Sequence, residues 1–335
     1  MSSPSRSDRR LSGRAKLLIA LALAVAAGAA VALALGLRDS SGSGDNSGSA
    51  RAASEWRWAP PMVHRRSYTA TGQINSKIYI AAGMVGNTGR PLDMLERFDP
   101  ATGNWASLKP LPVSFSAGAG AVLDNRLYVV GGDSQDANGR QVFRYDVATN
   151  RWQGTTPLPA PRTNLTAVAL GGKLYAIGGL DPVEPVSTVF VYDPRTSRWS
   201  KAAPLPVALQ AMGATVYHGE IWVLGGRVRN LRIQRRVWIY NPKQNRWRSG
   251  PSLPRPMDLL GVTTVGNRIH AVLESTYAIY DGRTRRWTLG PSLKVPRHAL
   301  GLFAVNGRLY AIGGCITPQL EDSSADETLP LSATR

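Results

Sequence analysis

Cysteine is nearly absent from this chain of 335 residues, which contains only Cys315. A single cysteine excludes an intramolecular disulfide and a cysteine-based zinc site. The four histidines, His64, His218, His270 and His298, are scattered without the close spacing that metal ligands need. The sequence also lacks a nucleophile elbow, a phosphate-binding loop and an acidic metal-binding loop. We therefore expect neither a metal nor a cofactor, and no residue is assigned a catalytic role.

Acidic residues are in the minority, with 22 Asp and Glu against 40 Lys and Arg and a formal net charge of +18. This excess of positive charge favours an anionic partner. The sequence carries no nucleic-acid-binding motif, so we do not expect nucleic acid to be that partner. The 34 glycines and 23 prolines suit many short strands joined by turns. The Arg-, Ala- and Gly-rich composition is typical of a bacterium with GC-rich DNA.

One long apolar run, residues 17–37, lies near the N-terminus and carries no charge. As a helix it would be about 31 Å long, close to the thickness of a hydrocarbon core. Five cations precede it: Arg6, Arg9, Arg10, Arg14 and Lys16. The positive-inside rule then predicts a single-pass membrane helix, with residues 1–16 as a basic cytoplasmic tail and the rest of the chain periplasmic or extracellular. A cleaved signal peptide, which would release a secreted protein, is the alternative.

A repeated pattern occupies most of the chain after a Gly/Ser-rich linker at residues 38–54. An apolar run ends in two glycines, as in LYVVGG (127–132) and IWVLGG (221–226), then a Tyr-Asp pair and a tryptophan follow. A period of 40 to 50 residues with frequent turns predicts a unit of four antiparallel strands. Radial repetition of such units makes a β-propeller.

This pattern resembles the Kelch repeat over residues 55–315, and six copies of the apolar-glycine strand imply an all-β, six-bladed propeller. The resemblance implies that the Tyr and Trp columns pack between blades and that the double glycine lets neighbouring backbone pass close. The sixth repeat has no tryptophan of its own. The segment EWRWAPPM (55–62) fits its outer strand, with Trp56 in the tryptophan column, and would close the ring. Residues 316–335 form an acidic C-terminal tail, which offers only TLPLSA (328–333) as a third strand.

The four strands of a unit alternate in direction. The connection into the innermost strand and the connection between the second and third strands therefore lie on the same face. Alignment of these strands puts a set of candidate ligand-binding residues at the central opening of that face: Arg66, Ser116, Arg162, Gln210, Asp258, Arg297 and His298. A loop of the fourth repeat adds a basic patch on the same face: Arg227, Arg229, Arg232, Arg235 and Arg236. Grouped arginines favour recognition of an anion.

The sequence therefore predicts an extracytoplasmic binding module that is tethered to the membrane. The expected ligand is a protein, an acidic glycan or an anionic lipid. The alternative is an exported carbohydrate-active enzyme, since the resemblance extends to sialic-acid mutarotases. Such an enzyme would need an acid–base pair and an arginine for a sugar carboxylate, and Asp258, His298 and Arg162 or Arg297 are the candidates.

Overall fold

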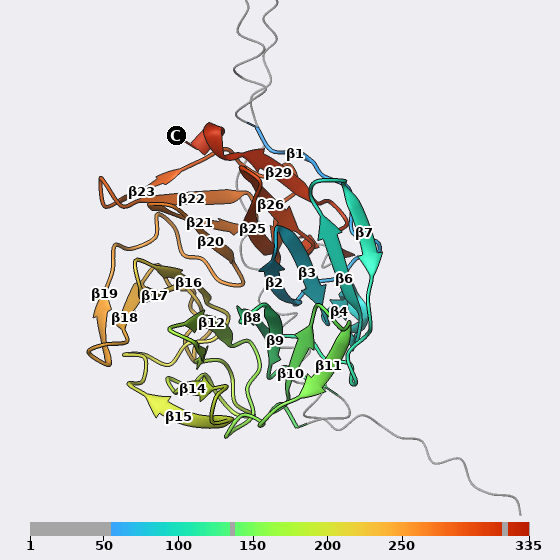
Figure 1. Cartoon of the computed structure of the whole chain (residues 1–335). Coiled ribbons are helices and arrows are strands. Elements are labelled where there is room, and N and C mark those ends of the chain that lie inside the picture. The colour runs from blue at the N-terminus through green and yellow to red at the C-terminus, as the bar shows by residue number, and fades with distance from the viewer. Residues whose placement is uncertain (1–54, 135–137, 317–320, 335) are drawn as a thin grey trace, which may run out of the picture. The chain divides into compact units, whose positions relative to one another are not determined.

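The computed structural model describes residues 55–134, 138–316 and 321–334, and their fold is all-β. Six four-stranded antiparallel sheets are arranged around a common centre (Figure 1). In the first five sheets the strands follow one another in chain order from the centre to the rim. Among the described residues, no helix has the length and apolar character needed to cross a membrane. The apolar run at residues 17–37, for which we predict such a helix, lies outside the described residues.

Each of the first three sheets takes its four strands from one repeat. The first contains β2 (Ala70–Ile74), β3 (Lys77–Ala81), β6 (Leu95–Asp99) and β7 (Asn104–Ser107). The second contains β8 (Ala119–Leu123), β9 (Arg126–Val130), β10 (Val142–Asp146) and β11 (Arg151–Gly154). The third contains β12 (Thr166–Leu170), β13 (Lys173–Ile177), β14 (Val189–Asp193) and β15 (Arg198–Ala202).

The remaining sheets complete the set. The fourth contains β16 (Gly213–Tyr217), β17 (Glu220–Leu224), β18 (Val237–Asn241) and β19 (Arg246–Ser249). The fifth contains β20 (Gly261–Val265), β21 (Arg268–Leu273), β22 (Thr276–Asp281) and β23 (Arg286–Leu289). The sixth contains β25 (Gly301–Val305), β26 (Arg308–Ile312), β29 (Glu327–Pro330) and β1 (Arg57–Trp58).

Short elements lie in the connections between these strands. They are β4 (Met84–Val85), β5 (Arg90–Pro91), β24 (Arg297–His298), β27 (Cys315–Ile316), β28 (Glu321–Asp322) and the 3-10 helices η2 (Gly86–Thr88) and η3 (Leu331–Thr334). Strand β28 lies antiparallel to β27, which in turn pairs with β24. The connections of the first and sixth sheets are therefore the most structured ones.

The sixth sheet joins the two ends of the described chain. Strand β1 pairs antiparallel with β29, with Arg57 opposite Thr328, and β29 pairs with β26. The outer strand expected at residues 55–62 is thus confirmed. Strand β29 overlaps TLPLSA (328–333), the one segment of the tail that the sequence offers as a third strand, although it lies beyond residue 315 and departs from the Tyr-Asp pattern.

Hydrophobic clusters join each sheet to the next one around the centre. One example contains Ile177 of the third sheet and Ile221 of the fourth. Another contains Ile78 and Phe98 of the first sheet together with Phe303 of the sixth. Packing of the sixth sheet against the first removes the open edges that a linear array of sheets would leave.

The tryptophan column fixes the spacing of neighbouring sheets. Six indole Nε1 groups donate hydrogen bonds of 2.8–3.0 Å to a backbone carbonyl near the start of the turn that follows the preceding outer strand. Trp56 belongs to this column, since it donates to Pro291 and is 1% exposed, whereas Trp58 is 59% exposed. The other five, Trp105, Trp152, Trp199, Trp247 and Trp287, are only partly buried.

The double glycines end the second strand of a sheet where backbone from the next sheet passes close. Gly225 has φ +63°, and a Cβ there would lie 2.0 Å from the carbonyl oxygen of Met257. The amide of Gly226 donates to that same carbonyl at 2.8 Å. A side chain at Gly225 would clash with Met257, so only glycine fits. The close approach expected from the sequence is confirmed.

Candidate functional site: the mouth of the central channel

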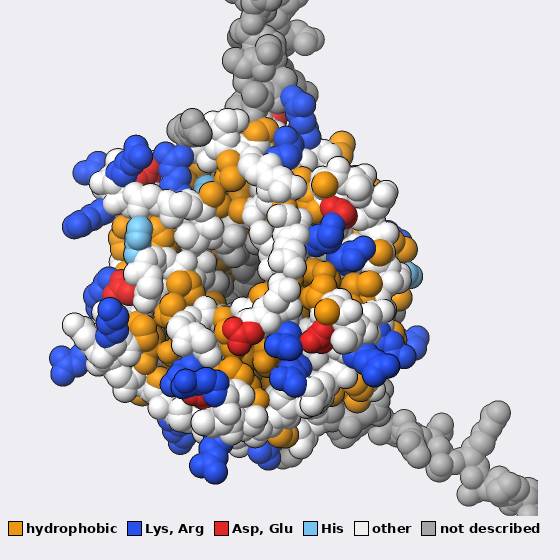
Figure 2. All heavy atoms as spheres, in the orientation of Figure 1, with side chains coloured by type: hydrophobic (Ala, Val, Ile, Leu, Met, Phe, Trp, Pro, Cys, Tyr) orange, Lys and Arg blue, Asp and Glu red, His pale blue; other side chains and the backbone are white. Residues whose placement is uncertain are grey.

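A central channel of about 420 Å³ runs between the innermost strands of all six sheets. Its wall is made of small and apolar residues with a few threonines, such as Thr71, Thr166 and Thr263, and none of the lining side chains is charged. Figure 2 shows one face of the molecule with a hollow at its centre. Charged groups therefore meet a ligand only at the ends of the channel.

One end of the channel, which we call the mouth, is framed by a ring of strained backbone. Six equivalent residues directly before the innermost strands adopt the left-handed conformation, with φ between 45° and 58°: Tyr68, Ala117, Asn164, Ala211, Leu259 and Ala299. The amides of the last five each donate to the carbonyl of the preceding member at 2.7–3.0 Å. This chain of hydrogen bonds compensates the strain and holds the mouth in one shape.

Two of the predicted ligand-binding arginines are buried and serve the fold instead. Arg66 and Arg297 are both 0% exposed. Arg66 Nη1 donates to Glu96 at 2.5 Å, and Arg297 Nη2 donates to Glu327 at 3.1 Å. Each guanidinium also donates to backbone carbonyls of its own sheet. We correct the expectation for both residues, because a guanidinium without exposed surface does not reach a ligand.

Arg162 is the third arginine predicted at the mouth, and its hydrogen bonding is incomplete. It is 5% exposed, and its Nη1 donates to the carbonyl of Pro161 at 2.6 Å. Its guanidinium carbon lies 5.3 Å from the ring centroid of Phe190, and Nε has no hydrogen-bond partner among the described residues. Burial lowers the pKa of Arg162, with the Asp181 carboxylate opposing that effect.

A cluster of ionisable residues from four sheets lies at the mouth. Arg227 Nε donates to Asp258 Oδ2. The rings of Tyr68 and His298 meet edge to face at 6.2 Å between centroids. Burial raises the pKa of Tyr68 to about 12, and the nearby charge of Arg227 opposes that rise. The structure thus brings Asp258 and His298 together with Arg227, which the sequence placed in the basic patch.

Tyr68 was not among the residues predicted from the sequence, although its position carries a signal. It is the only aromatic residue at the left-handed position of the mouth, where the other repeats carry Ala, Asn or Leu. Two other predicted residues are mostly buried there. Ser116 exchanges backbone hydrogen bonds with Asp133, and Gln210 Oε1 accepts one from Asn164 at 3.4 Å.

The predicted basic patch is largely engaged within the protein. Arg229 forms an ion pair with Glu184 at 3.0 Å, and Arg227 is bound to Asp258. Arg235 donates to the carbonyl of Leu253, and Arg236 lies over the Trp238 ring at 5.9 Å. Within residues 55–134, 138–316 and 321–334, the structure gives Arg232 alone of the five no side-chain partner. The patch therefore offers less free charge than the sequence indicates.

No group of His, Cys, Asp and Glu in the described part of the chain is arranged to hold a metal ion. The acid–base pair that mutarotase-type chemistry needs is also constrained. Asp258 is tied to Arg227, and the pKa of His298 is lowered to about 4, mainly by burial and further by Arg227. His298 is therefore neutral near neutral pH, and the Asp258 carboxylate is occupied by Arg227.

Two histidines, the buried His270 and the partly buried His298, make the stability of the protein depend on pH. The pKa of His270 falls from 6.5 to about 4 through burial and the charge of Arg268, and His298 behaves alike. Between these values the unfolded chain binds more protons than the folded one, so stability is lost as pH falls from about 6.5 to about 4. Asp326 acts in the opposite sense, because burial raises its pKa to about 7.

We therefore expect the free energy of unfolding of the His270→Leu variant to fall less than that of the wild type as the pH is lowered. Urea denaturation of the wild type and the variant at about pH 7 and about pH 5 measures the effect. Asp326 contributes equally to both proteins. The difference between their changes in unfolding free energy from about pH 7 to about pH 5 therefore gives the contribution of His270. Identical changes would show that His270 does not titrate as its burial requires.

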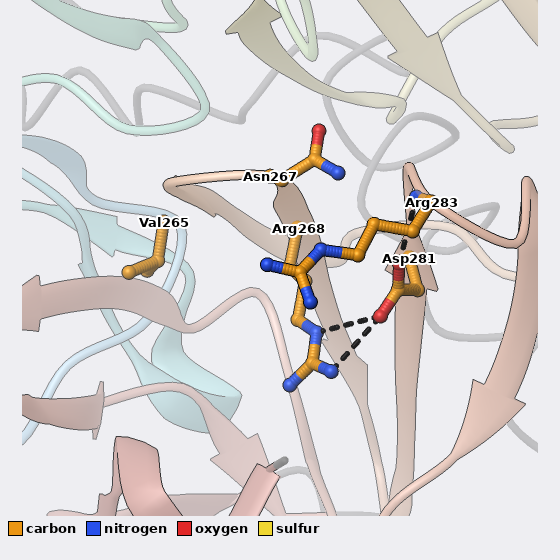
Figure 3. A pocket seen from close by; sticks show the side chains of 5 residues that line it. All are labelled: Val265, Asn267, Arg268, Asp281 and Arg283. Atoms are coloured by element: carbon orange, nitrogen blue, oxygen red, sulfur yellow. Dashed lines mark hydrogen bonds and ion pairs between the residues drawn. The ribbon is translucent and has the colours of Figure 1, made fainter.

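A second cavity, of about 500 Å³, lies at the opposite end of the fifth sheet. It is lined by Val265, Asn267, Arg268, Asp281 and Arg283. Figure 3 shows Arg268 bound to Asp281 through two hydrogen bonds, of 3.1 and 2.9 Å, with the Arg283 side chain reaching across above it. Arg268 is therefore neutralised, whereas the structure gives the Arg283 guanidinium no ion pair within its described residues.

Comparison with known proteins gives consistent results. A family profile for the KLHDC2/KLHL20/DRC7 Kelch-repeats domain matches residues 67–273. Kelch-like protein 41 of Rattus norvegicus is 30% identical over 84 residues, or 25% of this chain and 14% of that protein. The F-box protein AFR of Arabidopsis thaliana is 30% identical over 79 residues, or 24% of this chain and 21% of that protein. The matches thus span a small part of these relatives.

The structure has a counterpart among solved structures. The structure of YjhT matches with a TM-score of 0.71 and 15% identity, covering 80% of this chain and 95% of that one. At this identity the likeness concerns the fold alone. Antiparallel four-stranded sheets packed around a channel, with such a neighbour, define a β-propeller. Because the profile matches more than half of the sequence, the chain belongs to the Kelch-repeat family.

Proposed function

We propose that this chain is a membrane-tethered, extracytoplasmic Kelch propeller of six blades that binds a protein partner at the mouth of its channel. The observation that carries the binding site is the chain of backbone hydrogen bonds around the mouth, beside which the Tyr68, Arg227, Asp258 and His298 cluster lies. A preorganised rim loses little conformational entropy when a partner binds. The apolar run at residues 17–37 supports the tether.

The charge at the mouth favours a partner with apolar contacts and few charges. The channel wall is uncharged, and four of the eight arginines predicted on this face are in ion pairs: Arg66, Arg297, Arg227 and Arg229. Exposed apolar side chains lie on the loops of this face, with Val183 at 84% and Val85 at 40% exposure. We favour binding over catalysis because Asp258, the candidate base, is held by Arg227.

Peptides selected from a random display library on the wild-type chain are expected to bind at the mouth. Val183→Arg should then weaken the selected peptides at least about fivefold, since a buried interface contact is worth about 1 kcal/mol or more. Leu289→Arg is the matched control, because Leu289 is also exposed, at 53%, but lies on the outer strand β23. Loss of binding in the control alone would place the partner site on the outer strands instead.

A further inference from the structure

Three consecutive sheets carry the same basic motif in the hairpin between their two outer strands. The motif has seven residues: it starts with Asp or Asn, has Arg or Lys at its third position and ends in Arg-Trp. It lies at residues 193–199, 241–247 and 281–287. The corresponding hairpin of the first sheet, residues 99–105, has alanine and asparagine at the two cationic positions. We call six residues the hairpin ladder: Arg195, Arg198, Lys243, Arg246, Arg283 and Arg286.

The register of the strands brings these cations to one end of neighbouring sheets. Arg198 lies opposite Asp193, Arg246 opposite Asn241 and Arg286 opposite Asp281. Shared hydrophobic clusters make the third sheet a neighbour of the fourth, and the fourth a neighbour of the fifth. Figure 2 shows Lys and Arg side chains gathered along the rim where Figure 1 labels β15, β19 and β23. The ladder is therefore continuous across three sheets.

The ladder has fewer of its cations in ion pairs than the basic patch at the mouth, where Arg227 and Arg229 are paired. All six side chains are exposed. Arg195 pairs with Asp193 at 3.3 Å, and over the residues that the structure describes the other five form no ion pair. The hairpin ladder is thus the larger free positive surface, and it lies at the end of the propeller opposite the mouth.

The cavity in the fifth sheet gives this surface a recess for a single anionic group. Arg283 of the ladder reaches across its opening, and the amide side chain of Asn267 forms part of its wall (Figure 3). Arg268 is already bound to Asp281, so the free charge facing the recess is that of Arg283. A phosphate group has the charge and the hydrogen-bond acceptors that such a guanidinium binds.

The chain reaches the propeller from the same end. Strand β1 is the outer strand of the sixth sheet, and its pairing with β29 places Trp56 and the residue before it at the hairpin end. Two exposed apolar side chains lie at matching positions on neighbouring outer strands: Trp58, two residues after Trp56, and Leu289, two residues after Trp287. Tryptophan is enriched at membrane–water interfaces.

We propose that the hairpin ladder docks the propeller onto the phosphate headgroups of an anionic lipid surface, with Arg283 and its recess taking one headgroup. The choice of lipid over a soluble polyanion rests on the proposed membrane tether, since the tether would join the propeller at this end. Lysines and arginines near an anionic membrane each contribute about 1 kcal/mol, so several together suffice for stable docking. Docking in this orientation leaves the mouth facing away from the membrane.

Hydrogen exchange of the full chain in vesicles tests this docking. In mixed phosphatidylcholine and phosphatidylglycerol vesicles, amides of the three hairpins should exchange at least about fivefold more slowly than in pure phosphatidylcholine. High salt should remove the difference, because it screens exposed charges. The triple variant Arg198→Gln, Arg246→Gln and Arg286→Gln should lose the protection, while Arg229→Gln with Arg232→Gln at the mouth should keep it.

The outcomes separate docking from the tether. Carbonate washing of the vesicles should retain both the wild type and the triple variant through the tether. If the chain is retained but its hairpins exchange alike in both lipids, the docking proposal is wrong. If washing releases the chain, the tether is wrong, and salt-sensitive sedimentation with phosphatidylglycerol vesicles then decides docking. Protection of the hairpins by heparin but by neither vesicle would overturn the lipid assignment.

Discussion

Replacing Glu327 with alanine is expected to lower the free energy of unfolding by about 3–5 kcal/mol, because it leaves the Arg297 guanidinium buried without its counter-ion. Both side chains are 0% exposed, and Glu327 also accepts the backbone amides of Lys294 and Val295. Urea denaturation of the full chain measures the loss. Glu327 lies in β29, so the result also reports on how strongly that strand holds the sixth sheet.

A surface pair provides the control for this experiment. Glu220 pairs with Arg248, whose side chain is 55% exposed, and Glu220→Ala should cost less than about 1 kcal/mol. The double variant Arg297→Met with Glu327→Leu should recover most of the stability, since it removes both buried charges. Equal losses for Glu327→Ala and Glu220→Ala would contradict the burial of the Arg297 pair.

The second large effect is expected at Trp56. Trp56→Ala should destabilise the protein by about 3–5 kcal/mol, because it removes a buried ring that packs on Tyr277 at 5.6 Å and a hydrogen bond to Pro291. The loss falls on the strand that joins the two ends of the propeller. Chemical denaturation of the variant gives the magnitude.

Trp58 offers a matched substitution two residues away. It is 59% exposed, so Trp58→Ala should change stability by no more than about 0.5 kcal/mol. The pair of variants therefore tests the register of β1 against the tryptophan column. If Trp58→Ala is the more damaging change, the strand is shifted, and the closure of the sixth sheet is wrong.

The repeat predicted the parts of the fold that depend on periodicity. Trp56 could be placed because its distance to the following proline turn matches the other repeats. The close approach at the double glycines could be predicted too, because paired glycines at the end of a strand indicate backbone that leaves no room for a side chain. At Gly225 the positive φ and the nearby Met257 carbonyl confirm this. Strand β29 could not be recognised in the same way, because Leu329 stands where the other repeats have an aromatic residue.

The role of the buried arginines was harder to foresee. A charged residue at an aligned loop position suggests exposure, and its partner lies elsewhere in the chain. A signal existed: Glu96 follows Arg66 by 30 residues, and Glu327 follows Arg297 by the same distance. The same offset in two repeats indicates an ion pair within one sheet. Arg162 lacks such a partner, because its ring neighbour Phe190 occupies the facing position.

The location of unpaired positive charge could not be predicted from the sequence either, because it depends on which cations find an acidic partner in the fold. Sequence counting favoured the run from Arg227 to Arg236, but folding pairs Arg227 with Asp258 from the following repeat and Arg229 with Glu184 from the preceding one. The acids of the hairpins, Asp193 and Asp281, are already bound to Arg195 and Arg268, so the other hairpin cations form no ion pair within the described residues. They keep their charge, although their sequence density is lower.

A crystal structure of the chain with a selected peptide would test the central claim most directly. We predict that the peptide lies over the mouth of the channel and contacts the loops around the left-handed ring, near Tyr68, Asn164 and Val183. A peptide bound to the hairpin ladder or to the outer strands, with the mouth left open, would contradict it.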